Sequence, residues 1–241
     1  MKLSVVVPVY NERGTVREIL RRLLAVDWKA LGLEREIVLV DDGSQDGTRE
    51  VLREIEADPS AVGLQEGELR VILHPVNQGK GAALRTGFEA VTGDVAVVQD
   101  ADLEYDPRDL PRLLEPILDG RADVVFGNRF YGGGPHRVLY FWHYVGNKLL
   151  TTLSNVLTNL NLADMEVGYK VFRTEVLRRI RIKSRRFGVE PELTVKVARL
   201  GCRIYEVPIS YHGRTYAEGK KITWRDGLVA LWCLLRFRFF D

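Results

Sequence analysis

An alternation of short apolar runs with helically spaced apolar residues dominates the first half of the chain. Residues 3–9 (LSVVVPV) are a β-branched apolar run, typical of a strand buried on both faces of a sheet. In residues 14–26 the apolar side chains recur at the three- to four-residue spacing of a helix. The cycle repeats to residue 128, and strands that alternate with helices indicate right-handed crossovers. The pattern therefore predicts an α/β fold with a mostly parallel sheet.

The same pattern sets the bounds of the other expected elements. In the first half we expect further strands at 36–42, 69–74, 94–102 and 122–128, and helices at 46–57, 79–91 and 107–118. Beyond residue 128 the regularity fades, and we expect helices at 137–160, 191–200 and 224–239 and strands at 169–173 and 203–211. Loops are expected at 161–168 and 213–221, the second of them mobile, and a flexible joint at 131–135 (YGGGP).

Length and composition narrow the class of protein. The chain has 241 residues, of which 46% are hydrophobic and 28% charged, so it can bury a core and is neither disordered nor fibrous. Cys202 and Cys233 cannot form a disulfide framework or a zinc cage by themselves, which favours a reduced, cytoplasmic protein. Residues 1–14 lack the features of a signal peptide, and no apolar run reaches about 18 residues, so we expect no transmembrane segment.

The two halves of the chain differ strongly in charge. Residues 1–120 contain 14 Lys and Arg against 23 Asp and Glu, a net charge of −9, whereas residues 121–241 contain 21 against 10, a net charge of +11. This asymmetry indicates that the second half faces an anionic partner, such as a phosphate or a membrane surface, although a surface imbalance without a partner is the alternative. A nucleic acid is disfavoured, because the acidic half would repel its backbone.

Polar segments follow the first five predicted strands. Because ligands of open parallel sheets bind outside the carboxyl ends of the strands, we expect these segments to share one rim. They comprise residues 8–12, 41–44, 74–81, 100–104 and 128–129. Five polar segments on one rim predict a site large enough for a nucleotide.

The carboxylates after the fourth strand carry the strongest chemical signal. Asp100 and Asp102 are two residues apart, so an extended backbone would point both side chains to one side, and Glu104 would join them. Oxygen ligands without His or Cys suit Mg²⁺ or Mn²⁺ bridging a diphosphate. Helix capping accounts for Asp106, which precedes Pro107, but leaves Asp100 and Asp102 unexplained. A bound cation is the simpler account of like charges this close together.

Two common nucleotide-binding motifs are missing from their required places. A dinucleotide-binding fold needs G-x-G-x-x-G after the first strand, where this chain has PVYNERG at residues 8–14. A P-loop needs G-x-x-x-x-G-K-[ST], and the chain has instead Gly79-Lys80-Gly81 after the third strand. That turn could still bring backbone N–H groups and Lys80 close to a phosphate.

An ordered series of segments resembles a known family. The segments PVYNE (8–12), VDDGS (40–44), N-x-GKG (77–81), DADLEYDP (100–107) and GNR (127–129) together resemble the nucleotide-diphospho-sugar transferases of glycosyltransferase family 2. The DADLEYDP form, with GNRF and DMEVGYKVFR (164–173), is similar to the polyprenyl-phosphate sugar synthases, the dolichol-phosphate mannosyltransferase and dolichyl- or undecaprenyl-phosphate glucosyltransferase group. The resemblance implies a GT-A fold with C-terminal amphipathic helices, in one catalytic domain. Residues 1–128 would bind the nucleotide-sugar and residues 129–241 the acceptor.

The resemblance also implies a role for individual residues. Asp102 and Arg129 would be catalytic, and Asp100, Asp102 and Glu104 would bind Mg²⁺ or Mn²⁺, with Glu104 standing where relatives often carry Gln. The nucleotide-sugar would be bound by Pro8, Tyr10, Glu12, Asp41, Asp42, Lys80, Asp100, Ala101 and Asp102, and which aspartate of the 41–42 pair faces the base stays open. The acceptor phosphate would meet Arg129, Arg137, Arg214, Lys220 and Lys221. Asp164 and Gly168 match recurrent positions of the family.

The implied reaction is the inverting transfer of a hexose from a donor such as UDP-glucose or GDP-mannose to a polyprenyl phosphate. Such an acceptor is already an anionic nucleophile near neutral pH, since the second pKa of a phosphate monoester is about 6, and it needs little or no general base. The alternatives are a GT-A transferase with a glycolipid, polysaccharide or soluble sugar as acceptor, and a nucleotide-sugar-binding domain without catalysis. The Q-x-x-R-W segment of polysaccharide synthases is missing at Trp224-Arg225.

Two segments of the second half suit a lipid interface. Tyr140, Phe141, Trp142 and Tyr144 lie at the start of an amphipathic helix, and residues 228–240 (LVALWCLLRFRFF) combine apolar residues with arginines. Core helices with snorkelling arginines are the alternative. We expect a peripheral protein on the cytoplasmic face of a membrane, either naturally so or as a shortened form of a longer relative.

Overall fold

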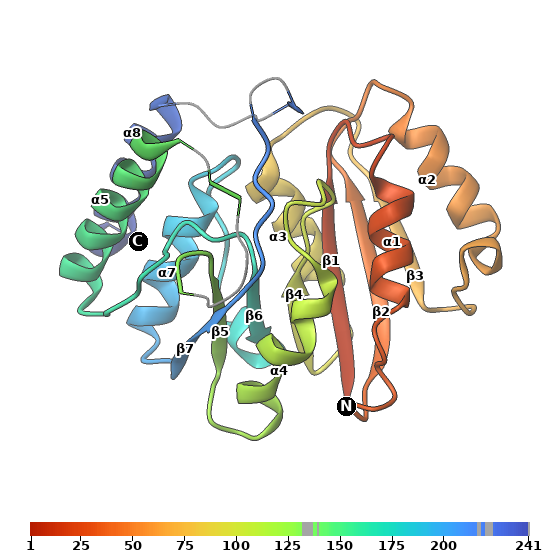
Figure 1. Cartoon of the computed structure of the whole chain (residues 1–241), viewed down its shortest axis with the longest axis horizontal. Helices are drawn as coiled ribbons and strands as arrows, with labels where there is room; N and C mark the ends of the chain where they lie inside the picture. Colours follow the sequence, from red (N-terminus) through yellow and green to blue (C-terminus); the bar gives the residue numbers. More distant parts are fainter. Residues whose placement is uncertain (132–136, 139, 216–217, 220–223, 241) are drawn as a thin grey trace.

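The computed structural model describes residues 1–131, 137–138, 140–215, 218–219 and 224–240. Its described strands form a seven-stranded sheet in the order β3-β2-β1-β4-β6-β5-β7 (Figure 1). The strands are β1 (Lys2–Val9), β2 (Glu34–Asp41), β3 (Leu69–Leu73), β4 (Val95–Val98), β5 (Val124–Asn128), β6 (Lys170–Arg173) and β7 (Ile204–Pro208). Only β6 runs antiparallel to its neighbours, β4 and β5. The predicted α/β fold with a mostly parallel sheet is confirmed.

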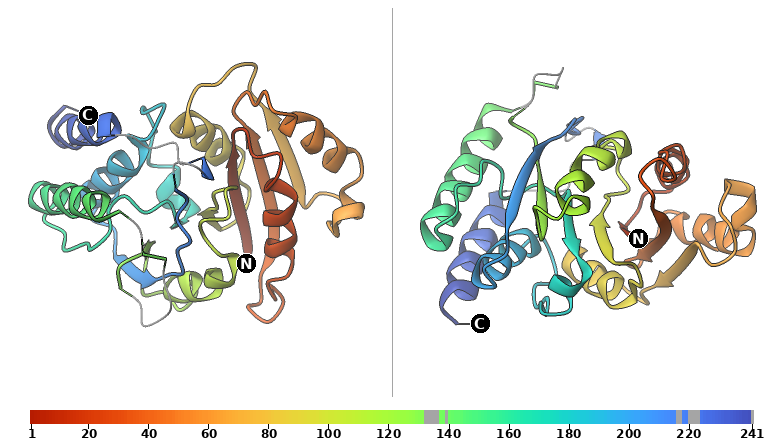
Figure 2. Two further views of the ribbon diagram at one scale, coloured as in Figure 1. Left: turned by 45° about the horizontal axis from the view of Figure 1, so that its top comes forward. Right: turned by 90° about the horizontal axis from the view of Figure 1, so that it is seen from below.

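Helices cover both faces of this sheet and extend past its β7 end (Figures 1 and 2). They are α1 (Val16–Leu24), α2 (Thr48–Ala57), α3 (Lys80–Ala90), α4 (Leu110–Leu118), α5 (Phe141–Thr158), α6 (Thr174–Leu177), α7 (Val189–Arg199) and α8 (Trp224–Phe239). The described residues also include two short 3₁₀ helices, η1 (Pro59–Val62) and η2 (Pro107–Asp109). The short elements α6 and η1 were not expected from the sequence, because four residues carry too little periodicity to be recognised.

The first βα unit shows why the sequence pattern was informative. In β1, Val5, Val6 and Val7 are almost fully buried, since the strand lies inside the sheet and is covered on both faces. Helix α1 turns Ile19 and Leu20 into the same core. Each such buried side chain contributes about 1.5–3 kcal/mol of hydrophobic stabilisation.

The fourth strand is shorter than predicted, and this changes the geometry after it. The expected strand over 94–102 ends at Val98, and the chain then forms turns in which Leu103 has a φ of 63°. The extended backbone expected for Asp100 and Asp102 is therefore wrong. The prediction for Asp106 is confirmed, because its side chain accepts a hydrogen bond from the Arg108 N–H at the start of η2.

The two halves of the chain share one sheet. Strand β6, from the second half, lies between β4 and β5 of the first half, and β7 pairs with β5 in parallel. This arrangement places the carboxyl ends of β1, β2, β4 and β5 near the loops that follow β7, at the top of Figure 1.

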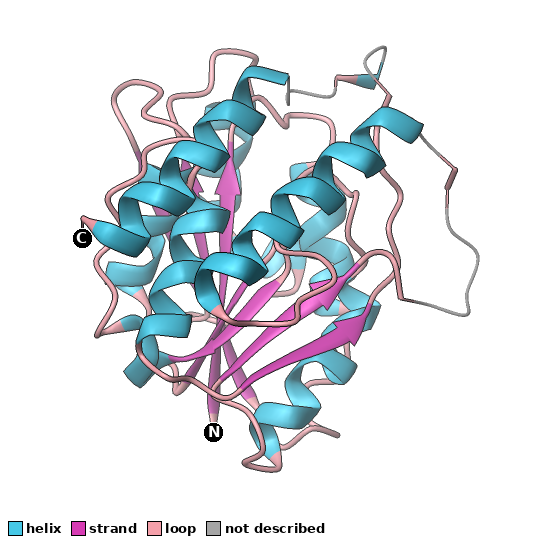
Figure 3. Cartoon of the chain, turned by 90° about the vertical axis from the view of Figure 1, so that its left-hand side faces the viewer, coloured by secondary structure: helices cyan, strands magenta, loops and turns pink. Residues whose placement is uncertain are grey.

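Helices α5 and α8 lie side by side on the outside of the molecule (Figure 3). Their outer surfaces expose large apolar side chains, including Phe141, Trp142 and Leu149 on α5 and Leu228 and Trp232 on α8. None of the helices in the described ranges is both long enough and apolar enough to cross a membrane.

Candidate active site

Lys80 joins the start of α3 to the segment after β4. Its Nζ lies 2.9 Å from the Asp100 carboxylate and 3.1 Å from Glu190 Oε1 on α7. Burial lowers the pKa of Lys80, but the attraction of Asp100 and Glu190 outweighs this, and the pKa lies well above its usual value. Gly168 packs on this pair, because a Cβ there would come within 2.5 Å of Asp100 Oδ2. Lys80 is thus a fixed cation at the predicted diphosphate site.

Arg214 inserts its side chain among three carboxylates on the same rim. Its Nη2 lies 3.1 Å from Asp102 Oδ2 and 3.3 Å from Glu12 Oε1, and its Nε lies 3.5 Å from Glu104 Oε1. The Arg214 backbone N–H also donates to Glu104, at 2.7 Å, and the Tyr211 hydroxyl donates to the other oxygen of Glu104. The structure thus brings together four of the residues that the sequence predicted for the donor site and the phosphate loop.

The carboxylates after β4 carry more negative charge than their partners neutralise. Burial, together with the charges of Asp100 and Glu104, raises the pKa of Asp102 to about 7, while Arg214 lowers it. Among the described residues, no three His, Cys, Asp or Glu side chains converge closely enough to hold a metal ion, and the Arg214 guanidinium lies between them instead. The oxygen ligands and their excess negative charge fit a hard divalent cation.

Asp41 and Asp42 are buried and engaged with the protein itself. Asp41 pairs with Arg49 at 2.8 Å and accepts hydrogen bonds from backbone N–H groups of the following turn. Asp42 accepts from the Gln78 and Gly79 N–H groups and contacts His74. Both aspartates therefore shape the loops at the ends of β2 and β3, a role the sequence analysis did not foresee.

The Gly79-Lys80-Gly81 turn packs tightly against the loop before α7. A Cβ on Gly79 would lie 2.4 Å from the Arg185 carbonyl oxygen, and Gly79 has a φ of +98°. The Gly79 N–H donates to Asp42, and the Lys80 side chain extends from the turn to Asp100.

The other residues predicted for the nucleotide lie along the same rim. Pro8 and Tyr10, at the end of β1, are partly exposed, and Ala101 is buried beneath the turn after β4. Glu12 is 8% exposed and accepts a hydrogen bond from the Thr15 hydroxyl.

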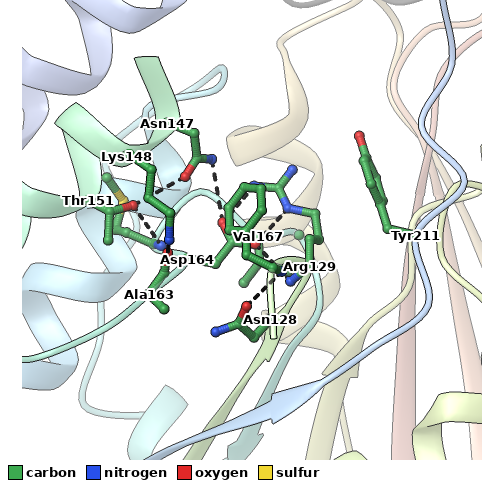
Figure 4. Close-up of polar contacts among 12 residues, drawn as sticks. Asn128, Arg129, Asn147, Lys148, Thr151, Ala163, Asp164, Val167 and Tyr211 are labelled. Atoms are coloured by element: carbon green, nitrogen blue, oxygen red, sulfur yellow. Dashed lines mark hydrogen bonds and ion pairs between the residues drawn. The ribbon is translucent and has the colours of Figure 1, made fainter. Parts of the chain in front are cut away.

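Arg129 is held by Asp164 at the end of β5. The Arg129 Nε and Nη2 atoms each lie 2.7 Å from an Asp164 oxygen, a bidentate pair that leaves Nη1 outside it. Burial lowers the pKa of Arg129, but Asp164 outweighs burial and keeps it well above its usual value. Asn147 and Lys148 of α5 approach the same loop, and the Tyr211 ring lies on the other side of Arg129 (Figure 4). Asp164 therefore orients a permanently charged guanidinium.

The remaining basic residues extend this loop region. Arg137 donates to the Gly213 carbonyl oxygen at 3.1 Å and pairs with Glu218 at 2.9 Å, so it contacts the segment that carries Arg214. Lys220 and Lys221, and most of the joint at 131–135, lie outside the described residues.

Sequence reasoning missed several polar residues of this region. Glu190 contacts Lys80, and Lys170 is buried and donates to the Met165 and Val167 carbonyl oxygens. Burial lowers the pKa of Lys170 to about 8 and, together with Glu190, raises that of Glu166 to about 8. Glu166 and Lys170 lie in the DMEVGYKVFR segment, which carries the family resemblance, but the sequence analysis gave neither residue a role.

Comparisons with known proteins identify the family. The model of the glycosyl transferase family 2 domain matches residues 4–181, so the chain belongs to this family, with a GT-A fold. It is 31% identical over 91% of its length to dolichol-phosphate mannosyltransferase of Pyrococcus furiosus, of which it spans 59%. It is 32% identical to undecaprenyl-phosphate mannosyltransferase of Micrococcus luteus, with 99% of both chains covered.

Solved structures agree with the fold assignment. Glucosyl-3-phosphoglycerate synthase from Mycobacterium tuberculosis, in complex with Mn²⁺, UDP and phosphoglyceric acid, superimposes with a TM-score of 0.72 at 26% identity. The match covers 100% of this chain and 79% of the synthase. The same enzyme has also been crystallised with Mg²⁺ and UDP.

Proposed function

We propose that the chain transfers a hexose, with inversion at the anomeric carbon, from a nucleotide-diphospho-sugar to a polyprenyl phosphate. The observation that carries the proposal is a single rim that holds the carboxylates Asp100 and Asp102, the cation Lys80 and the oriented guanidinium of Arg129. The names of two relatives, which specify dolichol phosphate and undecaprenyl phosphate, support the lipid acceptor.

The residues after β4 would hold a divalent cation. Asp100, Asp102 and Glu104 offer carboxylate oxygens, and a bound Mg²⁺ or Mn²⁺ would neutralise charge on the leaving diphosphate. For this the Arg214 side chain has to leave its present place between Asp102 and Glu104. Once displaced, Arg214 is free to pair with a phosphate of the donor. The metal ion then neutralises the carboxylates, and Arg214 neutralises part of the charge of the donor.

Arg129 would position the acceptor. An oxygen of the acceptor phosphate attacks the anomeric carbon, the bond from that carbon to the diphosphate oxygen breaks, and the nucleoside diphosphate leaves. Because the attacking oxygen is already anionic, no side chain has to remove a proton, and the difficulty is to bring two anions together. The fixed charges of Arg129 and Lys80 lower that repulsion.

The exposed surface of α5 and α8 would lie on the lipid. Phe130, next to Arg129, packs its ring 5.2 Å from Tyr144 of α5, so the apolar surface begins beside the proposed acceptor site. Aromatic side chains of α5 and arginines at the end of α8 are the combination that binds an anionic interface. We place the protein at the cytoplasmic face of a membrane, in peripheral contact.

The proposal is tested by transfer of radiolabelled sugar to polyprenyl phosphate. UDP-glucose, GDP-mannose and UDP-N-acetylglucosamine are offered in turn with Mg²⁺ or Mn²⁺, and product is counted in the organic phase. We expect product from one donor and a loss of at least about a hundredfold in Asp102→Asn, with Asp119→Asn on the exposed end of α4 as the matched control. Metal-dependent hydrolysis of a donor without lipid product would reject the acceptor and keep the donor site.

A further inference from the structure

Two carboxylates that the proposed reaction does not use lie in this region: Glu190 contacts Lys80, and Glu166 is close enough to Glu190 to feel its charge. Glu190 is 5% exposed, and its Oε1 pairs with Lys80, whereas its Oε2 is buried and has no hydrogen-bond partner among the described residues. Glu166 also has a buried oxygen, Oε1, that is without a partner in the same part of the chain. Buried oxygens without partners cost free energy, about 1–3 kcal/mol each, and these two are able to accept hydrogen bonds from a bound ligand.

The position of these oxygens relative to the diphosphate site limits what the ligand can be. Lys80 contacts both Asp100 and Glu190, so only the Lys80 ammonium separates Glu190 from Asp100, one of the carboxylates assigned to the metal ion. Gly168, two residues after Glu166, packs against Asp100 and Lys80. Lys80, Asp100 and Glu166 each keep part of their side chains exposed, so the group is open to solvent on that side.

From this arrangement we infer that Glu166 and Glu190 bind hydroxyl groups of the donor's sugar ring and select an uncharged hexose. The inference rests on the proposed function, because it assumes a nucleotide-sugar on the diphosphate site. A sugar linked to that diphosphate lies next to it, and its hydroxyl groups are donors that carboxylate oxygens can accept.

A second cation fits this place less well than a hydroxyl group does. It would have to lie near the Lys80 ammonium, which is already 3.1 Å from Glu190. The protonation of Glu166 also favours a neutral ligand. Burial, Glu190 and Asp164 raise its pKa, Lys170 and Arg129 lower it, and the net result is a pKa of about 8. At neutral pH Glu166 is thus mostly protonated and can donate to a hydroxyl oxygen, while Glu190 accepts.

The test compares the binding of a nucleotide-hexose with that of the nucleoside diphosphate alone, by calorimetry in the presence of Mg²⁺. UDP with UDP-glucose and GDP with GDP-mannose are the pairs used. We expect Glu190→Gln and Glu166→Gln each to lower the affinity for the nucleotide-hexose by about tenfold relative to the affinity for the nucleoside diphosphate. The affinity for the nucleoside diphosphate itself should change little. Glu175→Gln, on the exposed side of α6, is the matched control, and thermal unfolding confirms that each variant is folded.

A second arm uses a donor whose sugar is charged. UDP-glucuronate should bind the unmodified protein no more tightly than UDP, because its carboxylate would face Glu190. An unchanged affinity ratio in both variants, or uronate binding as tight as glucose binding, would overturn the inference. Failure of every nucleotide to bind would overturn the proposed function and the inference together, whereas hexose-dependent binding without transfer to lipid would reject only the acceptor.

Discussion

Arg214 Nη2 lies 3.1 Å from Asp102 Oδ2, although the two residues are separated by 112 positions in the sequence. The Arg214 guanidinium lies between carboxylates that we assign to a metal ion. The same side chain contacts Glu12 and Glu104. A metal ion that binds here therefore has to replace the Arg214 guanidinium beside these carboxylates. This replacement has measurable consequences.

Replacing Arg214 with Ala should strengthen the binding of Mn²⁺ to the protein without nucleotide. The substitution removes a positive charge that competes for Asp102 and Glu104. We expect the dissociation constant of Mn²⁺, measured by titration calorimetry, to fall severalfold, while sugar transfer becomes slower because a phosphate partner is lost. Weaker or unchanged Mn²⁺ binding would contradict the competition.

The binding of Mn²⁺ should depend on pH through Asp102. Its pKa is raised to about 7 by burial and by the neighbouring carboxylates, so below pH 7 a proton has to leave before the carboxylate can bind a cation. The apparent affinity should fall about tenfold per pH unit below 7 and level off above it. In Asp102→Asn this dependence should disappear over the same range; its persistence would assign the titration to another group.

Two exposed tryptophans should contribute to membrane binding. Trp142 on α5 is 78% exposed and Trp232 on α8 is 60% exposed. The double variant Trp142→Ser, Trp232→Ser should lower the partition onto vesicles that contain phosphatidylglycerol by at least about tenfold, since each ring contributes apolar area at the interface. Val76→Ser, on the exposed loop after β3, controls for the loss of apolar surface and should leave the sedimentation of protein with vesicles unchanged.

Glu36 should stabilise the fold in a pH-dependent way. Burial raises its pKa, but hydrogen bonds from Lys2, Ser4 and Thr92 outweigh burial and lower it to about 2. Because the folded pKa is below the unfolded value, this stabilisation is present above about pH 4.5 and is lost as the pH falls toward 2. Glu36→Gln should lower the free energy of unfolding at pH 7 by about 1–3 kcal/mol.

The measurement for Glu36 is urea unfolding at several pH values. The variant should lose less stability than the unmodified protein between pH 4.5 and pH 2.5. Glu66→Gln, at an exposed position before β3, is the control and should behave as the unmodified protein does. A parallel loss in both proteins would show that other carboxylates dominate acid unfolding.

Local patterns predicted much of the fold and part of the site. The strand at 3–9 was found because β-branched runs differ from helical spacing. The shared rim was expected because ligands of open parallel sheets bind outside the carboxyl ends of the strands. The early end of β4 was missed, since the turn through Leu103 depends on contacts from distant segments, including the Tyr105 hydroxyl that accepts from the Gly168 N–H. The Arg214 contacts and the position of Glu190 beside Lys80 also arise only when the chain folds.

The identity of the acceptor is the most direct test of the account. Polyprenyl phosphate and 3-phosphoglycerate, which is an acceptor class suggested by the likeness to glucosyl-3-phosphoglycerate synthase, are offered together with the preferred labelled donor. The reaction contains vesicles. Organic extraction then separates the labelled lipid product from the labelled phosphoglycerate product. The account predicts that the label enters the lipid phosphate, and that Arg129→Ala lowers this transfer far more than it lowers donor binding. Label confined to the phosphoglycerate product would contradict it.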